Sequence, residues 1–314
     1  MKSADRSWVT ADIPPEAHAA LARGLPATDV WSLLLDVLAQ RALQRTPADL
    51  LRQWERDGFT QPAYIDQRTL VALDGHLLAA AAAFEAVELS PLAPLGACSV
   101  VGLASQNKIV SALRGTEVVS DPTNVLALEC AKRLRRDPSR EVRLATCHRC
   151  VRAQEIPKLP GYAPHFRIFC LVTAGREKKD HAFLVDTLVE HIDTQLAALD
   201  RLEQHGYAFP DRSVKILATS TRASLGDRIA AAVSAKQVSV VRDVLEHAYY
   251  DGLRFMISTR TATGIQIPLI DGGAFDWLGK LTSNRRLTMV ASGMGAQLAA
   301  YLFRPGALPS NTSS

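Results

Sequence analysis

The stretch from Arg140 to Lys178 constrains the fold most, because it contains two strand-like runs joined by a broken loop. Val142 to Val151 and Phe166 to Thr173 are both rich in β-branched and apolar residues, as strands are. Proline and glycine interrupt the segment between them, at Pro157, Pro160, Gly161 and Pro164. The two runs are therefore expected to form neighbouring antiparallel strands.

Arginine is unusually frequent along this pair of strands, at Arg149, Arg152 and Arg167. The planar guanidinium group makes paired hydrogen bonds to phosphate or carboxylate, so the strands could carry a site for an anionic ligand. An ordinary solvated hairpin explains the same residues equally well. Both interpretations stay open at this point.

Composition sets the broad class of the protein. The chain has 314 residues, of which 47% are hydrophobic, and a net charge of +4, which is typical of globular proteins and too weak for a general nucleic-acid binder. No apolar run reaches membrane-spanning length, and the N-terminus has no apolar signal segment. Five cysteines, an odd number, fit a reducing compartment. We therefore expect a cytoplasmic protein without membrane association.

The rest of the chain alternates between helix and strand patterns. Helices are expected at 30–43, from 47 to about 57, and at 67–83, 122–136, 180–205, 225–248 and 297–303. Strands are expected at 84–89, 98–103, 117–119, 214–219, 255–259, 265–270 and 289–292, with a turn at Gly272-Gly273. This pattern predicts an α+β domain on a mostly antiparallel sheet flanked by helices. Residues 1–65 are expected to form a helical accessory region, 66–303 the core and 304–314 a flexible tail.

Taken in order, these segments resemble the catalytic core of class II aminoacyl-tRNA synthetases, and within that class the histidyl-tRNA synthetase branch. AFEAVELSPLAPLG looks like motif 1, and CVRAQ with HFRIF looks like motif 2. MVASGMGAQLAAYL looks like motif 3. EVVSDPTNVLALECAKR, AYYDGLRFMIST and IPLIDGGAFDWLGKL are similar to three further segments of that branch. The resemblance spans Gln67 to Phe303 and implies a class II fold.

The resemblance also implies roles for individual residues. Arg152 matches the motif 2 arginine that holds the α-phosphate of ATP and the substrate carboxylate, and Arg167 matches an arginine of the second strand; both are predicted to be catalytic. The residues predicted to bind the ligand are Glu117, Thr123, His148, Arg149, Gln154, Tyr249, Tyr250, Gly272 and Gly273. ATP with Mg²⁺ is the implied candidate cofactor, and a homodimer through residues 67–96 the implied assembly.

Several departures from the family pattern argue against tRNA charging. Motif 3 should carry an arginine that clamps the γ-phosphate of ATP, but Ala296 and Gln297 stand there. Gln154 replaces the expected motif 2 glutamate, Ala274 replaces an arginine, and residues 245–248 replace Arg-Gly-Leu-Asp. No anticodon-binding domain is expected after Phe303. Each lost cation typically removes about 2–4 kcal/mol of transition-state stabilisation, so tRNA is not an expected partner.

Three functions fit these observations. The first is a synthetase-like paralogue that binds an amino acid or nucleotide and regulates a protein partner. The second is an ATP-dependent ligase that forms an adenylate and transfers it to an acceptor other than tRNA, with Lys280 or one of the arginines replacing the lost clamp. The third is a structural or interaction protein with an unused pocket.

Some of the same residues have alternative structural interpretations. Cys147 and Cys150 have the spacing of half a zinc site, but strand alternation would place them on opposite faces, so no zinc is expected. His148 could be a satisfied core histidine. Tyr249 and Tyr250 could be packing residues.

Overall fold

The computed structural model describes residues 13–102, 104–157, 161–234, 238–246 and 249–304. Of the predicted tail, residues 305–314 lie outside this part of the chain. None of the helices in the described ranges is long and apolar enough to cross a membrane.

A mostly antiparallel sheet of eight strands forms the centre of the described fold. Its order is β1 (Glu85–Ala86), β5 (Val142–Val151), β6 (His165–Arg176), β11 (Leu287–Met294), β10 (Gln266–Phe275), β9 (Leu253–Arg260), β7 (Ser213–Ala218) and β8 (Ser239–Val244). Only β1 with β5 and β7 with β8 pair in parallel, within the described strands. The predicted antiparallel pairing of β5 with β6 is confirmed.

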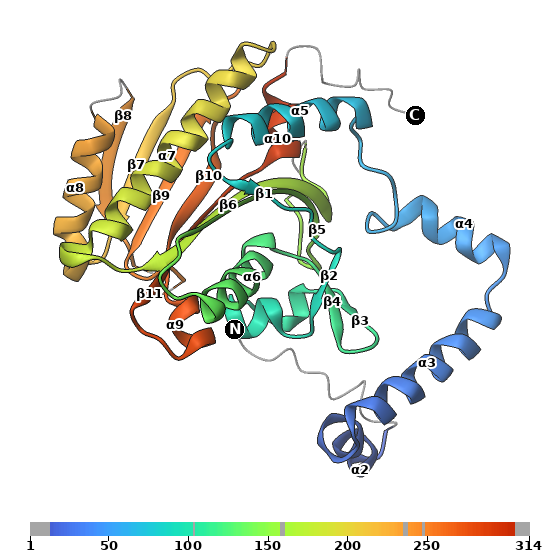
Figure 1. The fold of residues 1–314 in the computed structure, drawn as a ribbon. Coiled ribbons are helices and arrows are strands. Elements are labelled where there is room, and N and C mark those ends of the chain that lie inside the picture. Colours follow the sequence, from blue (N-terminus) through green and yellow to red (C-terminus); the bar gives the residue numbers. More distant parts are fainter. Residues whose placement is uncertain (1–12, 103, 158–160, 235–237, 247–248, 305–314) are drawn as a thin grey trace.

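Helices cover both faces of this sheet (Figure 1). One face packs against α5 (Gln67–Ala80), α7 (Ala182–Glu203), α8 (Ala223–Ser234) and α10 (Ala296–Leu302). The other face packs against α6 (Pro122–Arg136) and α9 (Trp277–Thr282). A small second sheet lies beside α6 and consists of β2 (Leu92–Pro94), β4 (Thr116–Val118) and β3 (Ser111–Ala112). The α+β class predicted from the sequence is thus confirmed.

The N-terminal helices extend away from this core (Figure 1). They are α2 (Pro15–Ala19), a π-helical turn (Ala20–Gly24), α3 (Ala27–Leu43) and α4 (Pro47–Arg56). None of them contributes a buried residue. Thr46 caps α4, and its side chain and that of Asp49 each accept the other's backbone N–H in a capping box.

The core is held across its centre by a buried histidine on α7. His191 is fully buried, and its two ring nitrogens lie 3.0 Å from the hydroxyl oxygens of Ser292 on β11 and Thr173 on β6. Gln195, one turn later on α7, also donates to Ser292 at 3.1 Å. Burial lowers the pKa of His191 to about 3, so the ring is neutral at physiological pH.

Three expectations from the sequence are wrong in detail. The segment near Cys98 is a π-helical turn, Ala97–Val101, in which the Cys98 backbone N–H donates to the buried carboxylate of Glu117 rather than to a neighbouring strand. The helix expected at 225–248 ends at Ser234, and the β-branched run that follows forms β8. Residues 235–237 and 247–248 of that expectation lie outside the described part. Gly272-Gly273 lies within β10 and is not a turn.

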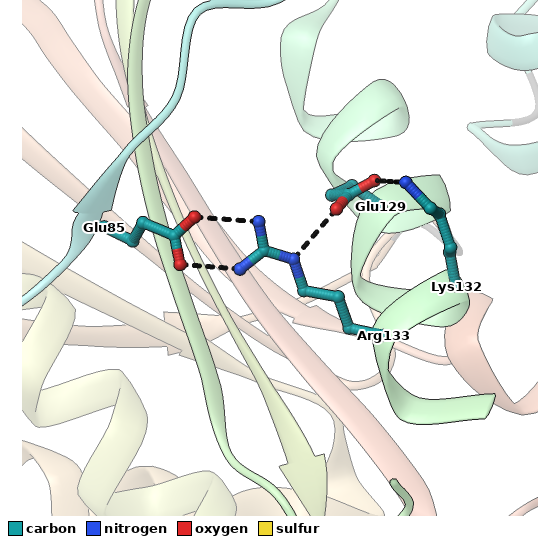
Figure 2. Close-up of polar contacts among 4 residues, drawn as sticks. All are labelled: Glu85, Glu129, Lys132 and Arg133. Atoms are coloured by element: carbon teal, nitrogen blue, oxygen red, sulfur yellow. Dashed lines mark hydrogen bonds and ion pairs between the residues drawn. The ribbon is translucent and has the colours of Figure 1, made fainter. Parts of the chain in front are cut away.

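The edge strand β1 is tied to α6 by a network of charged side chains (Figure 2). The Arg133 guanidinium donates to both carboxylate oxygens of Glu85, at 2.6 and 2.8 Å, and its Nε donates to Glu129 at 2.9 Å. Lys132 also pairs with Glu129, at 3.1 Å. These hydrogen bonds from Arg133 lower the pKa of Glu85. Lys132 and Arg133, two of the basic residues near the end of α6, therefore have structural partners.

We expect Arg133→Ala to lower the free energy of unfolding by about 1 kcal/mol, because a bidentate pair is stronger than an ordinary surface ion pair but this one remains partly exposed. Thermal unfolding should show a fall in Tm of about 2–4 °C. The effect should shrink as the pH falls through the lowered pKa of Glu85, where the carboxylate becomes protonated. The control is Arg136→Ala, at an exposed position; an equal loss of stability there would contradict the assignment.

Candidate functional site

A cavity of about 580 Å³ lies on the α6 side of the sheet. Its walls come from the segment that leads to β3, the start of α6, the loop between β5 and β6, and the facing parts of β6, β10 and β11. Pockets of this size hold ligands such as amino acids and nucleotides. Most of its lining is apolar, and the polar groups gather in a few places.

Arg152 is the best-anchored cation in this cavity. It follows directly after β5, and its Nε donates to the carbonyl oxygen of Ser120 at 3.0 Å. Its guanidinium carbon lies 5.0 Å from the centre of the Phe166 ring, and one terminal nitrogen lies 3.9 Å from the Asp121 carboxylate. The side chain is thus held in place while part of its hydrogen-bonding capacity stays available to a ligand.

Two carboxylates line the same cavity. Asp121 caps α6 and accepts the backbone N–H of Thr123 at 3.0 Å and its hydroxyl at 2.7 Å. Asp271 on β10 accepts two hydrogen bonds from Arg254, at 2.9 and 2.7 Å. Each carboxylate can accept more hydrogen bonds than these, so the cavity can hold a ligand that carries both an anionic and a cationic group.

One further acceptor in the wall has no partner of its own. Asn124 is 2% exposed, and its Oδ1 has no hydrogen bond among the described residues. A buried unpaired carbonyl oxygen is costly unless a ligand or water donates to it.

Aromatic rings close one side of the cavity. Tyr249 and Tyr250 meet edge-to-face at 5.0 Å, and both contact Phe275, at 5.5 and 5.0 Å. Burial, together with the nearby Asp271 carboxylate, raises the pKa of Tyr250, so its hydroxyl stays protonated. A Cβ at Gly273 would lie 2.5 Å from the Tyr250 ring, so this ring position requires glycine there.

The structure brings some of the predicted site residues together. Those that line the cavity are Thr123, Arg152, Gln154, Arg167, Tyr249 and Tyr250. The predicted residues outside its lining are Glu117, His148, Arg149, Gly272 and Gly273. Glu117 lies in β4 of the small sheet, and Arg149 lies in the large sheet with its partners His165 and Gln297.

Arg167 and Arg149 both direct their guanidinium groups to the α5 side of the sheet. Arg167 borders the cavity at its place in β6, but its guanidinium pairs with Asp74 of α5 on the opposite face. Arg149 lies beside Arg167 in the β5–β6 register and bonds to His165 at 2.9 Å and to Gln297 at 3.3 Å. Both arginines therefore have partners within the fold on the α5 side, away from the cavity.

The same contacts attach the N-terminal region to this pair of strands. His165 bonds through Nε2 to the carbonyl oxygen of Gln61 at 2.8 Å, while its Nδ1 meets Arg149. Gly58 packs against Pro164, and a Cβ there would lie 3.3 Å from that proline. The segment that follows α4 thus supports the loop carrying Arg152 from outside.

Glu117 and His148 are buried near the cavity but do not line it. Glu117 accepts the backbone N–H groups of Gly96 and Cys98 at 2.8 and 2.9 Å, and the Gln106 amide at 3.0 Å. Burial alone would raise the pKa of Glu117, but these hydrogen bonds outweigh it and lower the pKa. Burial lowers the pKa of His148, and its Nε2 has no partner among the described residues.

The two glycines in β10 permit close packing within the sheet. A Cβ at Gly272 would lie 2.6 Å from the Cβ of Ser292 and 2.7 Å from the Phe255 ring. Glycine is therefore required at position 272 so that the neighbouring strands can approach β10. Gly272 and Gly273 thus support the strands that form the wall of the cavity.

The two cysteines with half-zinc spacing pack in different clusters. Cys147 lies in the cluster on the α5 and α7 side, and Cys150 lies in the small cluster with Ala93 and Val119. The predicted placement on opposite faces is confirmed. No group of three or more potential metal-ligating side chains occurs in the described ranges.

Sequence reasoning missed several residues of the cavity. Asp121 was not among the residues predicted to bind the ligand, although an acidic residue just before Pro122 at the end of a strand can both cap a helix and contact a ligand. Asn124 and Lys108, which also line the cavity, had been given no role. The contact of Lys108 depends on the path of the segment before β3, which carries no sequence motif.

Comparison with known proteins identifies the fold. No protein-family model and no curated protein matches the sequence. An ATP phosphoribosyltransferase regulatory subunit/histidyl-tRNA synthetase from Bacillus halodurans matches with a TM-score of 0.55 at 14% identity, over 77% of this chain and 82% of that chain. A histidine–tRNA ligase subunit from Alicyclobacillus acidocaldarius matches with a TM-score of 0.57 at 14% identity, over 78% and 96%. The chain has the class II synthetase fold.

The match to this fold is not limited to proteins named for histidine. A putative threonyl-tRNA synthetase from Aeropyrum pernix gives a TM-score of 0.60 at 12% identity, over 75% of this chain and 59% of that chain. Identities this low establish the class II fold, and the function must be argued from the residues.

We expect Glu117→Gln to destabilise the class II core by about 1.5–3 kcal/mol, because an amide cannot accept all the hydrogen bonds that the buried carboxylate accepts. Denaturant unfolding at pH 7 measures the change. The difference from wild type should narrow as the pH falls through the lowered pKa of Glu117, where the native carboxylate is itself protonated. Glu155→Gln, at an exposed position, is the control; an equal effect of both variants would contradict the role given to Glu117.

Proposed function

We propose that this protein binds an amino acid or a nucleotide in the cavity at Arg152 and regulates a protein partner, rather than charging tRNA. The observation that carries the proposal is the position of Arg152, which is anchored by Ser120 in a cavity large enough for such a ligand. Histidine is one candidate among the amino acids.

The arrangement of charge in the cavity supports an amino acid. A carboxylate of the ligand would bond to Arg152, and an ammonium group would lie near Asp121 or Asp271. The unpaired oxygen of Asn124 offers one more acceptor. Tyr249 and Phe275 would then contact the ligand's side chain, and Gln154 and Thr123 would border its polar end.

The proposal of a regulatory role rests on what is missing from the catalytic apparatus. Neither β11 nor α10 supplies a cation to the cavity within the described residues, and Gln297 bonds to Arg149 on the other face. The Bacillus halodurans protein of the same fold is named as an ATP phosphoribosyltransferase regulatory subunit/histidyl-tRNA synthetase. We propose that this chain likewise acts on a protein partner. The homodimer through residues 67–96 and the cytoplasmic location stay predictions.

A thermal-shift screen with the twenty amino acids and common nucleotides tests the binding proposal. A true ligand at a concentration of 100 times its Kd should raise the stability by about 2.7 kcal/mol. Arg152→Ala should reduce the shift strongly, since it removes the anchored cation. Arg176→Ala, at an exposed position at the end of β6, is the matched control and should respond as wild type does. An unchanged shift in Arg152→Ala would contradict the site.

An adenylate-forming ligase is the alternative function, and one observation favours it. Two cations from different segments, Arg152 and Lys108, line the same cavity, as a site for activated phosphate would require. ATP would be held by these two residues, with Mg²⁺ bound chiefly through its phosphates. Exchange of pyrophosphate into ATP that depends on an added carboxylic acid would identify the ligase. If no carboxylic acid of a panel supports this exchange while the protein still binds a ligand, the ligase is ruled out and the regulatory function remains.

A further inference from the structure

The N-terminal arm, defined as residues 13–64, leaves most of its apolar side chains uncovered. Eight large apolar side chains of α3 and α4 are between 38% and 87% exposed. On α4, Leu50, Leu51 and Trp54 form one stripe at helical spacing, and the charged residues of the helix lie on its other side. Figure 1 shows that α3 and α4 follow one another around the outside of the core and do not lie side by side, so neither helix covers the other.

The core reaches α3 beside Trp31. A Cβ at Gly115, in the turn between β3 and β4, would lie 3.7 Å from the indole nitrogen of Trp31. Leu33, Val37 and Leu38 along the same helix remain exposed. A helix with an apolar face is stabilised mostly by the surface against which this face packs, so the arm lacks its packing surface within the described chain.

The exposed apolar surface on these two helices is large for a monomer. If a fully exposed side chain of this size offers about 100 Å² and half of it is exposed, α3 and α4 together present on the order of 400 Å². The largest apolar patch on a typical monomer is about 300–600 Å², and such patches often mark interaction sites. A standard interface takes about 800 Å² from each partner, of which about 65% is apolar in homodimers, so the two helices supply most of the apolar area that a stable dimer needs.

The charges of the arm argue against an anionic partner. Its six acidic residues outnumber its five arginines, and it contains no lysine. Nucleic acids and anionic membrane surfaces bind helices whose polar face is rich in lysine and arginine. A nearly neutral and apolar surface is instead typical of a permanent interface between protein chains.

The order of charges along α3 is complementary to itself in the antiparallel direction. Asp29 and Asp36 lie in its first ten residues, and Arg41 and Arg45 lie near and just beyond its end. In an antiparallel pair of α3 helices centred near Val37, Asp29 of each copy lies opposite Arg45 of the other, and Asp36 lies within one turn of Arg41. Opposite charges along the edge of an apolar seam favour this direction.

The two aspartates of α3 are available for such pairing. Asp29 accepts a hydrogen bond from Thr28 at 3.1 Å, and Asp36 accepts one from Gln40 at 2.8 Å, both within the same helix. Neither carboxylate pairs with a cation in the part of the chain that the structure describes. Each can therefore still accept hydrogen bonds from an arginine of a second copy.

We propose that the arm is a dimerisation element, in which α3 packs antiparallel on α3 of a second copy of this chain and α4 of each chain extends the apolar seam. The contact is isologous, because the same surface of both copies takes part around a two-fold axis near Val37. It lies outside residues 67–96, through which the sequence predicts a homodimer, and it does not depend on the ligand of the cavity.

Sedimentation equilibrium of the full chain over a range of concentrations tests the proposal. Leu33→Glu with Val37→Glu should raise the dissociation constant about 100-fold or more, because carboxylates within an apolar seam are costly. If residues 67–96 form a second interface, the same double variant should halve the mass of the assembly and leave that interface intact. Val100→Glu, at an exposed position outside both segments, is the matched control and should associate as wild type does.

Charge reversal tests the pairing of the two helices. Asp29→Arg with Asp36→Arg, and Arg41→Asp with Arg45→Asp, should each weaken self-association, because each pair of changes brings like charges together. An equimolar mixture of the two variant chains should associate more tightly than either chain alone. Reversal of all four residues in one chain should restore self-association, as an antiparallel pair requires.

Cross-linking tests the position of the two-fold axis. All five native cysteines are buried, so Val37→Cys adds an exposed thiol that a short bismaleimide should join to the same thiol of a second copy. Val100→Cys should stay uncross-linked under the same conditions.

A wild-type chain that is monomeric at all concentrations would overturn the proposal and leave the arm to a different partner. Equal dissociation constants for wild type and the Leu33→Glu, Val37→Glu double variant would overturn it as well. Because both side chains are exposed in the single chain, the double variant should still fold, and cooperative thermal unfolding would verify this.

Discussion

The alternation of side chains along β5 and β6 is the constraint on which the candidate site depends. In a strand, consecutive side chains point to opposite faces, so only every second residue of this antiparallel pair can reach the α6 side. Phe166, Ile168 and Cys170 lie on the cavity side, while Arg167, Phe169 and Leu171 lie on the α5 side. Arg152 lies two residues after Cys150, so the same alternation continued past the end of β5 places it on the cavity side.

The polar groups of the cavity come largely from the ends of elements and the segments between them. Asp121 lies where the chain leaves the small sheet and enters α6, and Lys108 lies in a short turn held by Glu117. The middle of the sheet contributes mostly apolar surface and glycine. The strands thus form the rigid wall of the cavity, and the segments between elements supply its charged groups. Functional side chains are commonly carried on such segments.

Much of the fold could be predicted from the sequence. The bounds of β5 and α6 agree with the structure, because a β-branched run and an Asp-Pro helix start are strong local signals. The strand β8 was missed, since its Ser-Val run follows a helix without a turn signal. Arg152, Tyr249 and Tyr250, all predicted for the site, line one cavity. The placement of Arg149, Glu117 and Lys108, in contrast, depends on strand register and on contacts between distant segments. Neither the strand register nor the contacts between distant segments can be read from the local sequence.

The buried histidine of α7 has a consequence for the whole fold. His191 joins the helix layer to two central strands, and because burial lowers its pKa to about 3 the ring is neutral in the fold at physiological pH. In the unfolded chain the same ring would take up a proton near pH 6.5. Between these two values the unfolded chain binds the proton and the folded chain does not, so acidification in that range favours unfolding. The residue that organises the centre of the sheet thus also lowers the stability of the fold as the pH falls from about 6.5 towards 3.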